Sequence, residues 1–226
     1  MKKMLLVMAA GTLFAAGTAQ AQSETVTSVN VVGYYSVTIP ANRLALVTPV
    51  LESFGSGNLD ELVGQQVPVG SKIYVWDRVN KNYIISTPNA ITKKWNYTNT
   101  LVRGDVFWIK PLTNGISYTI TMMGEVPGTY NSAGTTTVAN VTGTDAVGYT
   151  YPIDIAWTNT TLSVAAGKGA TMYIWNASTG SYTIYTSNLI TGNWNTPAGF
   201  LIKAGEAFWI KPKVPLDWIE EVPYDL

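Results

Sequence analysis

The chain carries one pattern of residues twice, and this duplication constrains its fold more than any other feature of the sequence. The first copy begins at Tyr74 and ends at Trp95, and it returns without a gap from Tyr173 to Trp194. Each copy has a Tyr-x-Trp triplet, spaced Tyr, Ile, Thr and Asn residues, an Ile-Thr pair and a second Trp. Further on, both copies reach a Phe-Trp-Ile-Lys-Pro segment that follows a Gly-acid pair. Because a duplicated unit must repeat whatever allows it to fold, the sequence predicts two related modules.

The first residues of the chain have the three parts of an export signal. Lys2 and Lys3 precede an apolar run, and the stretch ends in Ala-Gln-Ala. The run is too short to span a bilayer, and its ending predicts cleavage before Gln22. We therefore expect residues 1–21 to be a signal peptide and the protein to be exported to the periplasm, the cell surface or the extracellular space. No later apolar stretch is long enough for a membrane-spanning helix, so no integral membrane segment is expected after cleavage.

The composition argues against several classes of site. The chain contains neither His nor Cys, and so lacks the commonest metal ligand, the usual proton carrier near neutral pH and any disulfide. We expect no metal site and no cofactor. Without Lys2 and Lys3, twelve basic side chains face fourteen acidic ones, a net charge of about −2. The only basic pair of the mature chain, Lys93-Lys94, is typical of a solvated loop, and no nucleic-acid partner is predicted.

The mature chain has the composition of an all-β protein. Thr, Tyr, Val, Ile and Trp are frequent, charged residues make up only 12%, and Gly, Pro and Asn separate the apolar runs. Residues 57–64 depart from this pattern with an N-cap candidate, early acidic residues and a final Gly, which predicts one short helical turn. The second copy lacks that segment. The predicted strands cover residues 29–39, 44–50, 73–76, 83–86, 106–109 and 117–122, and then 172–175, 182–185, 207–210 and 216–219.

The repeat divides the mature chain into two modules. We expect a first β module over residues 22–127, a linker over 128–145 and a second β module over 146–226. The linker is rich in Thr, Gly, Ser and Asn, with room for one weak strand around residues 138–141. Modules of this size are small for independent stability without a disulfide or a metal. The expected fold is therefore two tandem antiparallel modules, sandwich-like or barrel-like, that pack against each other.

Several short motifs, in a fixed order, resemble those of a known group of proteins. They are the Asn-Val-Val-Gly-Tyr opening at 30–34, the Gly-Tyr entry at 148–149, the Tyr-x-Trp hairpins, the Phe-Trp-Ile-Lys strands and the exit at 121–127. This arrangement resembles a repeat in exported proteins of verrucomicrobial and planctomycete-type bacteria, a group for which we know of no established activity. The resemblance covers nearly all of the mature chain. It implies a secreted β module and transfers no catalytic residue.

Four of the repeated tryptophans lie within apolar β runs. A large ring flanked by Ile and Val on a strand is usually packed in a core. We therefore expect these four residues to be structural: Trp76, Trp108, Trp175 and Trp209.

The other two repeated tryptophans lie in polar loops. Trp95 is followed by Asn96, and Trp194 is followed by Asn195. An indole face beside an amide suits the apolar face and the hydroxyl groups of a sugar, so these four residues are candidate ligand-binding residues. The alternative, which we favour, is that each Trp folds back to cover an open end of its sheet.

Acidic side chains form no recognisable catalytic arrangement in the sequence. Asp105 and Glu206 follow a Gly at equivalent positions of the two copies, which is typical of turns. A glycoside hydrolase needs two carboxyl groups set across a cleft, and no spacing here predicts such a pair. No catalytic residue is assigned, and we do not expect an enzyme.

These observations favour a non-catalytic exported protein whose duplicated β modules act as a scaffold or adhesion unit. Its partner would be an extracellular polysaccharide or another surface protein. The second interpretation is a carbohydrate-binding module that uses the loop tryptophans, and a polysaccharide-active hydrolase is a distant third. Self-association is a further expectation, because β modules can expose unpaired edge strands.

Overall fold

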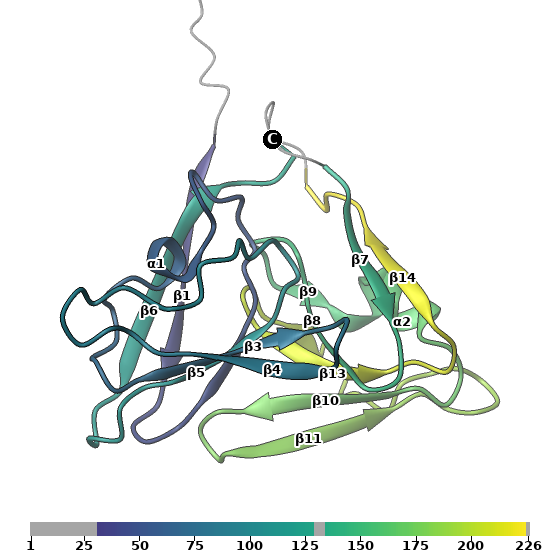
Figure 1. The fold of residues 1–226 in the computed structure, drawn as a ribbon. Coiled ribbons are helices and arrows are strands. Elements are labelled where there is room, and N and C mark those ends of the chain that lie inside the picture. The colour runs from purple at the N-terminus through teal and green to yellow at the C-terminus, as the bar shows by residue number, and fades with distance from the viewer. Residues whose placement is uncertain (1–30, 129–133, 225–226) are drawn as a thin grey trace, which may run out of the picture.

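The computed structural model describes residues 31–128 and 134–224 and shows two similar groups of antiparallel strands (Figure 1). The predicted all-β antiparallel class is confirmed. The predicted signal peptide, residues 1–21, lies outside the described residues.

The first module contains a two-stranded ribbon and a four-stranded sheet. The ribbon pairs β1 with β6, and the sheet has the order β2-β5-β3-β4. The predicted hairpin is confirmed as the antiparallel pair β3 and β4. Its elements are β1 (Val32–Ile39), β2 (Ala45–Val47), α1 (Leu59–Leu62), β3 (Lys72–Asp77), β4 (Asn82–Ser86), β5 (Phe107–Lys110) and β6 (Tyr118–Glu125).

The second module repeats this topology. Its ribbon pairs β7 with β14, and its four-stranded sheet has the order β8-β13-β10-β11. Two further short strands, β9 and β12, pair with each other. The elements are β7 (Thr136–Val141), β8 (Asp145–Gly148), β9 (Ile155–Ala156), η1 (Trp157–Asn159), α2 (Thr161–Ala165), β10 (Thr171–Asn176), β11 (Ser181–Thr186), β12 (Leu201–Ile202), β13 (Ala207–Lys211) and β14 (Leu216–Glu220).

The core of each module lies between the ribbon and one face of the four-stranded sheet. Strand alternation explains this, because successive side chains point to opposite faces. In the first module Ile120 and Met122 of β6 point inward, whereas Thr119 and Thr121 bond the hydroxyl groups of β1 on the other face. The sheet contributes six residues to this core: Ala45, Val47, Ile73, Val75, Phe107 and Ile109.

The predicted linker, residues 128–145, contains a strand, as one of its two interpretations allowed. Residues 136–141 form β7, which pairs with β14 as the first strand of the second module. The weak strand considered around residues 138–141 is therefore part of a ribbon, and Asp145 already begins β8. Thr-rich, Asn-rich composition is typical of linkers, but an exposed two-stranded ribbon tolerates the same polar residues on its outer face.

The predicted helical turn is α1, and a second turn appears where none was predicted. Asn58 caps α1 by accepting a hydrogen bond from the backbone N–H of Glu61. In the second module Thr160 caps α2 in the same way, with Ser163 as the donor. α2 contains no acidic residue in its first turn, so the sequence signal that revealed α1 is missing.

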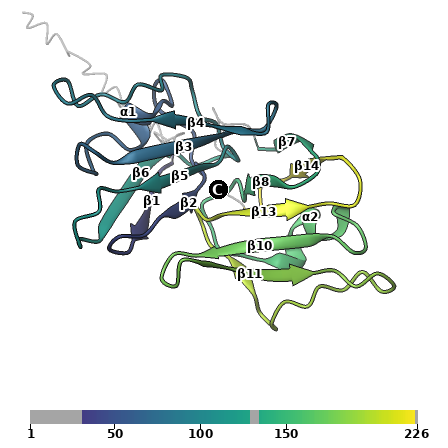
Figure 2. The same cartoon turned by 60° about the horizontal axis from the view of Figure 1, so that its bottom comes forward.

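The two four-stranded sheets meet through their inner edges, with β4 and β11 on opposite outer sides of the molecule (Figure 2). At the junction Val47 forms a bridge with Glu206, and Thr48 donates from its backbone N–H to Gly205 O at 3.1 Å. Gly148 lies against Thr48, so close that a Cβ built on Gly148 would lie 2.2 Å from Thr48 Cβ. These two residues follow β2 and end β8, so they are equivalent in the repeat.

The four strand tryptophans form the centre of this junction. The rings of Trp76 and Trp209 meet at 4.9 Å, and those of Trp108 and Trp175 meet at 5.1 Å. Trp76 is equivalent to Trp175 in the repeat, and Trp108 is equivalent to Trp209. The two contacts are therefore related by an internal two-fold axis, as in a symmetric homodimer. The prediction that these rings are packed holds, but they pack between the modules and not within either module core.

Two indole hydrogen bonds across the junction are related by the same approximate two-fold axis. Trp76 donates from Nε1 to Asp145 Oδ1 at 2.7 Å, and Trp175 donates to Leu44 O at 2.8 Å. Asp145 is fully buried and also pairs with Lys81 at 2.7 Å. A buried carboxylate requires such partners, because removing it from water is costly. The junction thus joins the two modules through packing, hydrogen bonds and an ion pair.

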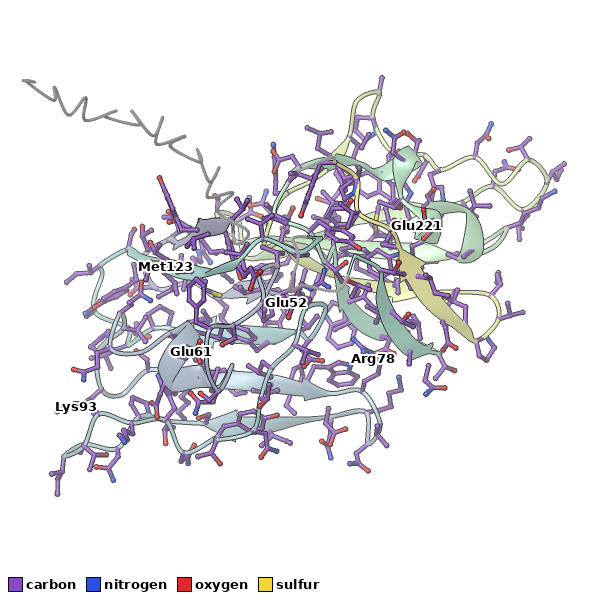
Figure 3. All side chains as sticks on the ribbon, turned by 90° about the horizontal axis from the view of Figure 1, so that it is seen from above. Glu52, Glu61, Arg78, Lys93, Met123 and Glu221 are labelled. Atoms are coloured by element: carbon purple, nitrogen blue, oxygen red, sulfur yellow. The ribbon has the colours of Figure 1, made fainter. Side chains whose placement is uncertain are left out.

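A buried arginine of the first module adds a further contact to the second module. Arg103 pairs with Glu52 at 2.6 Å and donates to Thr150 O, and its guanidinium lies 5.3 Å from the centre of the Tyr151 ring. Glu52 lies towards the middle of the molecule (Figure 3).

Lys93 lies at the outer tip of the first module (Figure 3). The position and exposure of Lys93 agree with the solvated loop predicted for the Lys93-Lys94 pair.

Candidate functional site

The structure places Trp95, the first candidate ligand-binding residue, in the core of the first module. Only 2% of this residue is exposed. Its backbone N–H donates to Asp60 Oδ1 at 2.8 Å, and its Nε1 donates to Gly64 O at 2.9 Å. The helical segment around α1 therefore covers the ring, which offers no face to a sugar.

Trp194 occupies the equivalent position of the second module and is partly exposed. Its Nε1 donates to Ser163 O at 2.8 Å, so α2 holds this indole as the α1 segment holds Trp95. The ring meets Trp157 edge to face, with centroids 5.0 Å apart and planes at 88°. Trp95 and Trp194 belong to separate cores, and they do not share a groove.

Asn96 and Asn195 have the same structural role in the two modules. The side-chain oxygen of Asn96 accepts from the Thr87 backbone N–H at 3.0 Å, and that of Asn195 accepts from Thr186 at 2.7 Å. Each bond fixes the loop after the second Trp to the end of the hairpin. The repeated asparagines are therefore explained by turn geometry, for which Asn is well suited.

A pocket of about 440 Å³ opens beside Trp194 and is lined in part by residues of β9 and α2. This volume falls in the range of small-molecule sites, about 300 to 1,000 Å³. Trp157, Trp194 and Phe200 supply three aromatic rings to the wall, and no charged side chain lines it. Polar residues complete the lining: Thr158, Ser163, Asn193 and Thr196.

The indole N–H of Trp157 is buried without a hydrogen-bond acceptor in the part of the chain that the structure describes. The residue is 1% exposed, and its Nε1 has no hydrogen-bond partner among the described residues. A buried N–H without an acceptor is unfavourable, by about 1 to 3 kcal/mol. Trp157 was not among the predicted site residues, because it lies where the two copies diverge. A tryptophan without a counterpart in the repeat was the signal that could have revealed it.

The two turn carboxylates, Asp105 and Glu206, lie at the base of the loops before β5 and β13. Asp105 Oδ2 accepts from the Val102 N–H at 2.9 Å, and Glu206 Oε2 accepts from the Lys203 N–H at 3.3 Å. Burial raises the pKa of both groups above the ordinary range for a carboxyl. Each module contributes one of them, and each closes its own turn.

A second cleft, of about 590 Å³, lies between the modules beside Arg78, and its lining includes Asn140 of β7. Its wall carries charge, from Asp77, Arg78, Lys81 and Asp105. Lys81 pairs with the buried Asp145, and Asp77 accepts from the backbone N–H groups of its own turn. These charged groups are largely engaged within the protein.

Comparisons with known protein families, with curated proteins and with solved structures found no match to this chain. Within residues 31–128 and 134–224, no helix has the length and apolar character needed to cross a membrane. In the same part of the chain, no three acidic side chains gather where they would hold a metal ion.

Proposed function

We propose that the protein is a non-catalytic adhesion protein, exported by its N-terminal signal, whose two modules form one unit that holds a polymer or another surface protein. The observation that carries this proposal is that the repeated side chains have structural roles. The tryptophans of the repeat join the modules or close their cores, and the asparagines and acids close turns. Duplication here builds a scaffold and leaves no repeated catalytic arrangement.

Three further acidic groups also have structural partners. Asp154 pairs with Lys203 at 2.7 Å, and Asp217 accepts from the Asn140 N–H at 2.8 Å. Glu220 is buried and accepts from Trp218 Nε1. Hydrolysis of a glycosidic bond requires one free acid and one free base facing each other. We therefore rank binding above turnover.

The test uses the mature chain, residues 22–226, and a panel of insoluble polysaccharides that includes cellulose, chitin, xylan, mannan and peptidoglycan. We expect the protein to sediment with at least one polymer and to release no soluble sugar from it. Release of reducing sugar by the purified chain would identify an enzyme. No sedimentation with any of the polymers would contradict polysaccharide adhesion and direct the search to protein partners.

Self-association through the outer strands is a second proposal, supported by β11. This strand lies at the edge of its sheet, and its six residues, Ser181–Thr186, include no charge and no Pro. Charged residues and Pro are the usual protection of an edge strand. We expect the measured mass to rise with concentration in analytical ultracentrifugation, and Thr183→Lys to suppress the rise. A monomeric mass at all concentrations would contradict it.

A further inference from the structure

We propose that the pocket beside Trp194 binds a neutral sugar residue of a polysaccharide, and that only the second module has such a site. The inference rests on the proposed adhesive function and names its ligand class. It differs from the second interpretation of the sequence, a site that would have used both Trp95 and Trp194.

The lining of the pocket fits a neutral pyranose ring. Such a ring has an apolar face of C–H groups and a rim of hydroxyl groups. Trp194 and Phe200, which are partly exposed, offer aromatic surface to the face, and the hydroxyl and amide groups of the wall suit the rim. No carboxylate or cation lines the pocket. An acidic sugar would therefore lose its hydration there without gaining an ionic partner.

Trp157 supports the partly exposed ring of Trp194. It is itself 1% exposed, and its ring meets that of Trp194 edge to face, with centroids 5.0 Å apart. The Nε1 of Trp194 donates to Ser163 O at 2.8 Å. These two contacts fix the Trp194 ring on which a sugar would stack.

The first module provides a built-in control. There the ring of Trp95 is 2% exposed, and the α1 segment covers it through Asp60 and Gly64. The inter-module cleft is a poorer candidate for the same ligand, because its wall is charged. A neutral sugar is thus expected to contact one of the two repeated loop tryptophans and not the other.

The first experiment is a titration of the mature chain, with ¹⁵N-labelled tryptophan, followed by NMR of the eight indole N–H groups. The probes are cellohexaose, chitohexaose, xylohexaose and mannohexaose, with hexagalacturonate as the acidic comparison. We expect at least one neutral oligosaccharide to shift the Trp157 and Trp194 signals and to leave Trp95 unchanged. Shifts confined to other tryptophans, shifts by hexagalacturonate alone, or no shift with any probe would overturn the proposal.

Surface variants test the pocket without removing a core ring. Val164 is 81% exposed and lines the pocket, so Val164→Arg introduces charge at its mouth with little effect on folding. Ile91→Arg is the matched control, because Ile91 is 89% exposed on the loop that carries Trp95. We expect Val164→Arg to weaken oligosaccharide binding at least tenfold and Ile91→Arg to leave it unchanged. Equal binding by both variants would overturn the site.

If the parent and Val164→Arg sediment equally with a polymer, adhesion stands and the pocket is not its site. If neither sediments, polysaccharide adhesion itself fails.

Discussion

Trp95 and Trp194 hold the same place in the repeat, yet one is sealed in a core and the other forms the wall of an open pocket. Both donate their indole N–H to a backbone oxygen, of Gly64 and Ser163 respectively. The repeat thus preserves the bond that fixes the loop. What differs is the surrounding segment, α1 with its acidic cap region in one module, and η1 and α2 with Trp157 in the other. The repeated tryptophan has a shared structural role, and the divergent segment around it leaves a pocket in the second module.

The largest predicted effect is on stability and concerns the junction. There Trp108 of the first module is buried, whereas Trp209 of the second module is partly exposed. Trp108→Ala should lower the free energy of unfolding by about 3 to 5 kcal/mol, because the ring is buried against Trp175. Trp209→Ala should cost less, since Trp209 borders an open hollow beside Thr144. Urea denaturation followed by circular dichroism measures both values. A larger loss of stability for Trp209→Ala than for Trp108→Ala would contradict this prediction.

The next prediction tests the close contact at the two-fold axis. Gly148→Ala places a Cβ 2.2 Å from Thr48 Cβ, and such overpacking typically costs about 1 to 3 kcal/mol. Adding Thr48→Gly removes the obstacle. We expect the double variant to be more stable than the sum of the single changes, a coupling that a double-mutant cycle measures. Strict additivity would show that the two residues do not meet.

A smaller effect separates the structural asparagines from the asparagine that lines the pocket. Asn96→Ala and Asn195→Ala should each lower the free energy of unfolding by about 0.5 to 1.5 kcal/mol, because each removes an acceptor from a backbone N–H. Asn193→Ala should weaken oligosaccharide binding and leave stability nearly unchanged. Thermal unfolding and calorimetric titration separate the two effects. Loss of oligosaccharide binding in Asn96→Ala would contradict a site confined to the second module.

The smallest effect is a pH dependence shared by the two turn acids. Burial raises the folded-state pKa of Asp105 and Glu206, opposed by Arg78 and Lys203 respectively. The folded state therefore binds more protons, and the contribution of each group to stability falls as pH rises from its unfolded pKa to its folded pKa. Asp105→Asn and Glu206→Gln should each be slightly more stable than the parent at pH 7. That gain should vanish below the unfolded pKa.

Unfolding curves between pH 3 and pH 7 measure this difference. The isosteric amides keep an oxygen that accepts from the Val102 or Lys203 N–H. A gain that persists at the lowest pH would mean that packing, and not ionisation, is responsible.

Much of the fold was predictable because it depends on local patterns. Alternation placed the inward residues of β6, the polar connections of the hairpins indicated their turns, and the Asn58 cap region indicated α1. β7 was anticipated only as a weak strand within a linker, because its sequence is rich in Thr, and its pairing with β14 makes it part of the second module. α2 was missed because it lacks the acidic first turn that revealed α1.

The candidate site was predictable only in part. The repeat drew attention to Trp194, which lines the proposed pocket, and equally to Trp95, Asn96 and Asn195, which the structure uses for packing and turns. Trp157 was overlooked because it has no counterpart in the first copy. Its relevance depends on an edge-to-face contact with Trp194, which a sequence does not display.

The sequence by itself determined the duplication, the antiparallel β class and the local turns, because these depend on residue order and on contacts between near neighbours. The tertiary structure alone decided which faces meet. It turned four repeated tryptophans into a two-fold junction, buried one loop tryptophan and left a pocket beside the other. The physical reason is that burial depends on segments distant in the chain, and two copies of one motif acquire different neighbours once the sequences around them diverge.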